Sequence, residues 1–153
     1  MLLLLSSLAL AAPKPASMEA CTRMDSAGIK MAMCGGVMVA YQDIPGDPSM
    51  GPVSFDAFNQ GLVQGLTGNA VEGEAPVVNT ESYPFVVKGK TVDGRHMNVS
   101  WNEETGARAM GGYSAGSYSK KNMRFGACFG LLEPGSEAPC LEILPYVMAK
   151  GLK

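Results

Sequence analysis

The apolar positions between residues 54 and 66 follow a helical spacing. They recur every three or four residues, at Phe55, Phe58, Leu62, Val63 and Leu66. Such a stripe is typical of an amphipathic helix that buries one face, and Ser54 is a suitable N-cap for it. A second helix is predicted from Leu141 to Leu152, with a bend at Pro145.

From Tyr83 onward the pattern changes to an alternation of apolar and polar residues, which is typical of half-buried strands. Strands are predicted over residues 37–41, 85–91, 95–101, 107–111 and 123–131. The chain is therefore predicted to be a disulfide-stabilised α+β protein. We expect an antiparallel sheet of about four to five strands, with helices packed on one face.

The register of the first predicted hairpin follows from the face that each loop length would make apolar. A two-residue turn at residues 93–94 would place Lys88 on the same face as Val99. A three-residue loop over residues 92–94 instead pairs Val87 with Val99 and makes one face mostly apolar. Because a slip of one residue moves every side chain to the other face, the three-residue loop is predicted.

Three further segments show other patterns. Near-helical spacing before Gly35 predicts one or two short helices, from the positions Ala20, Cys21, Met24, Ala27 and Met31. Residues 69–81 are predicted to form an acidic loop. Residues 112–122 are rich in Gly, Ser and Tyr, and we expect a flexible loop there.

The first residues of the chain indicate export. Residues 1–11 form an uncharged apolar run that ends in Ala9-x-Ala11, the small-residue pattern that signal peptidase recognises. A buried N-terminal helix is the alternative, but Pro13 and Pro15 would break it. We therefore expect a signal peptide up to residue 11 or 12, an extended tail over 12–17, a single α+β domain over 18–153, and a secreted or periplasmic location.

The cysteines fit an exported protein. There are four of them, Cys21, Cys34, Cys128 and Cys140, and none forms a C-x-x-C motif. Of the three pairings, Cys21–Cys34 with Cys128–Cys140 closes the shortest loops and is favoured. An unbroken helix over 21–34 would hold its ends about 20 Å apart. That distance excludes a disulfide, so the helix would have to stop between these cysteines.

Charge and hydropathy exclude several kinds of partner. Twelve Lys and Arg residues oppose fourteen Asp and Glu residues, giving a net charge of −2, so no nucleic-acid partner is expected. Gly, Pro or charged residues interrupt every apolar stretch before it reaches the ~20 residues that a bilayer span needs. Stable membrane insertion is therefore not expected, and no motif indicates a cofactor.

The single histidine suggests one catalytic alternative. His96 and Ser100 share a strand, but four residues along a strand span about 13 Å, which is beyond hydrogen-bond reach. A hydrolase would need a polar cluster beside His96, with Ser114, Ser117 or Ser119 as a nucleophile. A solvated strand histidine is the favoured interpretation.

Eleven methionines are the one oddity of composition. Several lie near cysteines, in the segments Met18-x-x-Cys21-x-x-Met24 and Met31-x-Met33-Cys34. Soft sulfur ligands of this kind suit Cu(I), so copper handling is an alternative function. Methionine also fills irregular gaps in cores, and this interpretation is favoured.

The leading hypothesis is a non-catalytic binding module whose partner is a protein or a small ligand. Tyr, Ser and Gly make adaptable contact surfaces, and they are abundant in residues 112–122. The candidate binding residues are Tyr113, Tyr118, Lys120, Lys121 and His96. Asn98-Val99-Ser100 matches the N-glycosylation acceptor pattern, with Asn98 expected to face outward.

Overall fold

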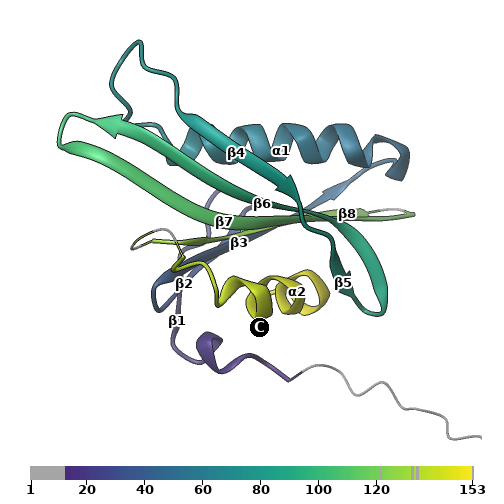
Figure 1. The fold of residues 1–153 in the computed structure, drawn as a ribbon. Coiled ribbons are helices and arrows are strands. Elements are labelled where there is room, and N and C mark those ends of the chain that lie inside the picture. The colour runs from purple at the N-terminus through teal and green to yellow at the C-terminus, as the bar shows by residue number, and fades with distance from the viewer. Residues whose placement is uncertain (1–12, 121, 132, 134, 153) are drawn as a thin grey trace, which may run out of the picture.

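An antiparallel sheet of eight strands, with one helix against each face, is formed by the described residues (Figure 1). The computed structural model describes residues 13–120, 122–131, 133 and 135–152. The strands are β1 (Cys21–Arg23), β2 (Lys30–Cys34), β3 (Val37–Pro45), β4 (Val77–Ser82), β5 (Phe85–Val87), β6 (Lys90–Glu103), β7 (Gly106–Ser119) and β8 (Asn122–Gly130). The helices are α1 (Gly51–Leu66), α2 (Cys140–Lys150) and two 3-10 turns, η1 (Ala16–Met18) and η2 (Pro48–Met50). The strand order is β1-β2-β3-β8-β7-β6-β4, and β5 pairs with β6.

The helices lie on opposite faces of the sheet, so the prediction that they share one face is wrong. On the α1 face, Phe55 and Phe58 stack on Phe125 of β8, with ring centroids 6.1 and 5.4 Å apart. On the α2 face, Leu144 packs with a core that includes Cys128. Strand β8 is apolar on both faces, so each face of the sheet must be covered by another element. The sheet is also larger than predicted.

The register predicted for the first hairpin is wrong as well. The turn is at Lys88 and Gly89, whose φ angles of 51° and 75° are typical of a two-residue type I′ turn. Phe85 therefore pairs with Val92. Gly94 lies outside this turn. A side chain would not fit at its position, because a Cβ there would lie 2.6 Å from the Phe85 ring. The hairpin folds toward α2, as Figure 1 shows.

The N-terminal segment forms strands where short helices were predicted. In the β1–β2 hairpin Cys21 lies directly opposite Cys34, with 4.2 Å between the Cα atoms. Met31 and Met33 then share one face of β2, and Ala32 is buried on the other. The side chains of β2 therefore alternate between two faces with a period of two. This segment forms a strand in place of the helix that the spacing predicted. A further strand, β4, occupies part of the predicted acidic loop 69–81.

The segment 112–122 is not a flexible loop, since β7 continues through it to Ser119. Its glycines make room for aromatic rings. A Cβ on Gly112 would overlap the Phe129 ring, and one on Gly116 would lie 3.1 Å from Phe55. Glycine enrichment here reflects close packing between strand and helix rather than chain mobility.

The favoured disulfide pairing is confirmed. Cys21 bonds to Cys34, and Cys128 bonds to Cys140. The second bond ties the first residue of α2 to β8, with 5.5 Å between the Cα atoms. Within the described part of the chain, no helix is both long and apolar enough to cross a bilayer.

Candidate functional site

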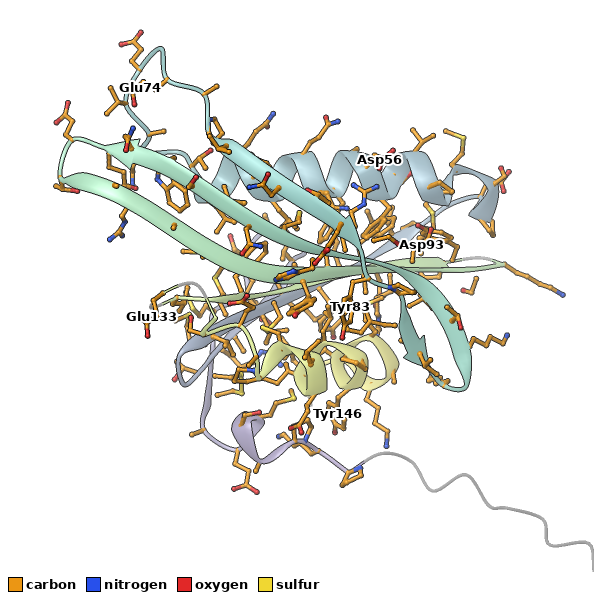
Figure 2. All side chains as sticks on the ribbon, viewed as in Figure 1. Asp56, Glu74, Tyr83, Asp93, Glu133 and Tyr146 are labelled. Atoms are coloured by element: carbon orange, nitrogen blue, oxygen red, sulfur yellow. A yellow bond between two sulfur atoms is a disulfide. The ribbon has the colours of Figure 1, made fainter. Side chains whose placement is uncertain are left out.

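A row of cross-strand neighbours places His96 among polar groups on the α2 face of the sheet. Glu81 of β4 lies opposite His96 of β6, which in turn lies opposite Tyr113 of β7. The imidazole stacks on the Tyr113 ring, with the centroids 4.6 Å apart and the planes inclined by 24°. Tyr83, labelled in Figure 2, meets the Tyr113 ring edge-on at 5.1 Å.

Both nitrogens of the His96 ring contact carboxylates. Nδ1 lies 3.1 Å from Oε1 of Glu81, and Nε2 lies 3.2 Å from Oε1 of Glu137. Glu137 is 7% exposed and lies in the turn that precedes α2. The backbone N–H of Gly135 donates to its other oxygen at 2.7 Å. Gly111 is required beside it, because a Cβ there would lie 2.6 Å from the carboxylate.

The two buried members of this cluster have shifted pKa values. Burial by itself would raise the pKa of Glu137, but hydrogen bonds from its own backbone amide, from His96 and from Gly135 outweigh burial and lower it. Burial raises the pKa of Tyr113, and the nearby Tyr83 and Glu137 raise it further. At neutral pH Glu137 is therefore an anion and Tyr113 is an uncharged phenol.

This arrangement links β4, β6 and the turn before α2 through the His96 ring. Ser114 lies on the α1 face, where its hydroxyl donates to Asn59 at 2.5 Å. Ser119 donates to the carbonyl of Asn122 at 2.8 Å, within its own hairpin. In the described part of the chain, the groups that hydrogen-bond to the His96 ring are carboxylates. The polar cluster that the hydrolase alternative required is present, but none of the described residues that contact the His96 ring is a serine.

The other predicted binding residues are not brought together. Tyr118 lies on the face opposite Tyr113, where it packs against Phe125 and donates to Asp93 at 2.9 Å. Lys120 is exposed at the β7–β8 turn, and Lys121 lies outside the described residues. Asn98 is exposed on β6, as expected.

The copper alternative lacks its thiol ligands. Cys21 and Cys34 are joined in a disulfide, so neither can supply a thiolate. Met18 is buried in the core on the α2 face. Met31 lines a cavity on the α1 face. The described residues hold no group of three or more His, Cys, Asp or Glu side chains arranged to bind a metal.

An apolar groove on the α1 face was not predicted. Helix α1 packs on β7 and β8, and the groove runs beside it over β2 and β3. Its volume is about 540 Å³. The main walls are formed by side chains of β2, β3, β8 and α1, namely Met31, Met38, Phe129, Phe58, Leu62 and Leu66.

The groove is uncharged and open beside the helix. None of the described residues that line it carries a charge, and Gln42 is its longest polar side chain. Gly61 and Gly65 lie one turn apart on α1, and a Cβ on either would have no atom within 4 Å. In the sequence, Met31 and Met33 lie two residues apart, which is the spacing of side chains on one face of a strand. That spacing does not show which part of the face α1 leaves open.

No family model matches this chain, and no curated protein is significantly similar to it. Function is therefore inferred from the arrangement of its own residues.

Proposed function

We propose that this protein is an exported, non-catalytic binding protein that takes an uncharged apolar small molecule in the groove between α1 and strands β2 and β3. The uncharged, mostly apolar lining of the groove carries the proposal, together with a volume of about 540 Å³. Sites for small molecules commonly enclose ~300–1,000 Å³ and are lined by hydrophobic and aromatic side chains. When an apolar ligand covers apolar surface that was open to water, the free energy of the complex is lowered, which favours binding.

The side chains of the groove also suggest what kind of ligand fits. Met31 and Met38 offer flexible, polarizable thioethers that adapt to different shapes. Phe58 and Phe129 offer flat apolar surfaces. Gln42 can hydrogen-bond one uncharged polar group of the ligand. Because the lining has no charge to balance an ionised group, a hydrocarbon-rich neutral molecule is the best match.

The two disulfides support the compartment in this proposal. Disulfides persist in oxidising environments such as the periplasm and the extracellular space. The expected signal peptide, residues 1–11 or 1–12, lies outside the described residues. Export therefore rests on the apolar pattern of that segment together with the paired cysteines.

Nile red, an uncharged apolar dye whose fluorescence rises in apolar surroundings, tests the groove directly. The purified protein should bind the dye saturably, and 1-dodecanol should displace it. Gly61→Leu should abolish binding by filling the groove. It should not lower the melting temperature, because leucine is favoured over glycine in a helix by up to ~1 kcal/mol.

The matched control is Gln60→Leu, which places the same side chain at an exposed position of α1 outside the groove. This variant should bind the dye as the unmodified chain does. Absence of saturable binding by the unmodified chain, or equal binding by the Gly61→Leu variant, would refute a ligand site in this groove.

A further inference from the structure

Among the described methionines, two groups of four differ in their access to water, and Met50 and Met110 belong to neither group. Four are buried with at most 4% of their surface exposed, namely Met18, Met97, Met123 and Met148. Four others lie on the α1 face of β2 and β3 or at the residue that follows β1, namely Met31, Met33, Met38 and Met24. Met24 is 45% exposed, and the other three are partly exposed. The second group is called the methionine face below.

Strand register brings the methionine face together. Met33 lies directly opposite Met38. The backbone N–H of Met24 donates to the carbonyl of Met31 at 2.9 Å, which extends the β1–β2 ladder by one pair. Side chains two residues apart on a strand point to the same face, about 6.6 Å from each other. Four thioethers therefore lie side by side, and those of Met31 and Met38 form part of the groove wall.

We propose that the methionine face is an oxidation site for hydrogen peroxide, and that its oxidation closes the groove to apolar ligands. The second part rests on the proposed function. One oxygen atom of the peroxide is transferred to the methionine sulfur. The O–O bond breaks, an S–O bond forms, the sulfur gives up two electrons, and the remaining oxygen leaves as water with both hydrogens.

Access to solvent determines which sulfurs react. The oxidant must reach the sulfur, and the four buried methionines are shielded by the core on both sides of the sheet. On the methionine face α1 lies to one side, because its main contacts are with β7 and β8. Disulfides persist in oxidising compartments, and in such a compartment these thioethers would meet the reagent.

Oxidation changes the groove without removing any part of it. A sulfoxide oxygen is a strong hydrogen-bond acceptor, and Gln42 is the only long polar side chain among the described lining residues. An apolar ligand would then have to cover an acceptor that has lost its water, which opposes binding. We expect affinity for Nile red to fall about tenfold or more when Met31 and Met38 are oxidised.

The experiment has two readouts on the full chain. Peptide mapping by mass spectrometry, after graded peroxide treatment, should find Met24, Met31, Met33 and Met38 oxidised before the four buried methionines. Nile red titration should show the loss of affinity in parallel. Methionine sulfoxide reductases should restore it, because sulfoxide formation is reversible by these enzymes.

Two variants locate the effect. In the double variant Met31→Leu and Met38→Leu, the affinity after peroxide should equal the affinity that the same variant has before peroxide. Met50→Leu removes a methionine that is 52% exposed and outside the groove. In this variant, peroxide should lower the affinity for Nile red as much as it does in the unmodified chain.

The outcomes separate the two proposals. Simultaneous oxidation of the four buried methionines and the four of the methionine face would overturn the oxidation site. Unchanged dye affinity after oxidation of Met31 and Met38 would overturn the closing of the groove. If the untreated chain does not bind Nile red, the proposed function fails, and the order of oxidation still decides whether the methionine face is an oxidation site.

Discussion

His96 joins three parts of the molecule through one side chain. Its ring lies on β6, one nitrogen contacts Glu81 of β4, and the other contacts Glu137 before α2. Each of the two carboxylates therefore has a ring nitrogen within hydrogen-bond distance. Since Glu137 is 7% exposed, its carboxylate depends on the donors around it, among them the Gly135 backbone N–H.

Glu137→Gln should lower the free energy of unfolding at pH 7 by about 1.5–3 kcal/mol, because it weakens charge-assisted hydrogen bonds at a buried site. The folded pKa of Glu137 lies below its ordinary value. Its contribution is therefore present above the ordinary carboxyl range and is lost as the pH falls through the folded pKa. Urea unfolding over about pH 2–7 should show a smaller acid-dependent loss in the variant.

Glu72→Gln is the control for this prediction, since Glu72 is exposed and lies in the loop before β4. It should leave both the stability at pH 7 and the pH dependence unchanged within ~0.5 kcal/mol. A Glu137→Gln variant with the acid dependence of the unmodified chain would show that the carboxylate is not stabilised in the folded state.

At the scale of elements, helix α1 and strand β8 were predictable, whereas the second half of β7 and the register at the start of β6 were not. Helix α1 and strand β8 have apolar patterns that extend over several turns or residue pairs. Residues 18–34 fit two periods, and the choice depends on the pairing of Cys21 with Cys34. The first hairpin was misassigned because the start of β6 pairs with β5 while a later part pairs with β4. Such a division of one strand between two partners leaves no mark on local alternation.

Strand β6 offers a test of its two faces. Val99 is 1% exposed and its neighbour Asn98 is exposed. Val99→Asp should destabilise the protein by several kcal/mol, on the order of 3–5, because it places an unpaired charge in the core. Asn98→Asp should change the free energy of unfolding by less than ~0.5 kcal/mol. Chemical denaturation of both variants checks this, and similar losses would mean that the faces of β6 are misassigned.

At the scale of the whole molecule, the candidate sites arise from residues that are distant in the sequence. His96 is 15 residues from Glu81 and 41 residues from Glu137. The groove exists because α1 covers one part of the α1 face and leaves the strands near the N-terminus open. Spacing along the chain reports which face a residue is on, but not which element will cover that face. The sequence therefore predicted the disulfide pairs and the α+β class but not the groove.

The proposed export can be tested at the scale of the whole chain with a reporter. Residues 1–20 fused to a periplasmic or secreted reporter should direct its export, with cleavage after Ala11 or Ala12. Leu4→Asp in the same fusion should block export, because a charge interrupts the apolar run. N-terminal sequencing of the released reporter gives the cleavage position. An uncleaved product retained inside the cell would contradict the proposed location.

The pairing of β3 with β8 has a consequence for the order in which the molecule assembles. Asp43 and Arg124 lie opposite each other in these strands and are 81 residues apart in the chain. The entropy of closing so large a loop must be offset before the centre of the sheet gains any contact, so folding is expected to be slow. The centre of the sheet cannot form until β8 has been made. The disulfide between Cys128 and Cys140 can then fix α2 onto a sheet whose middle strands are already joined.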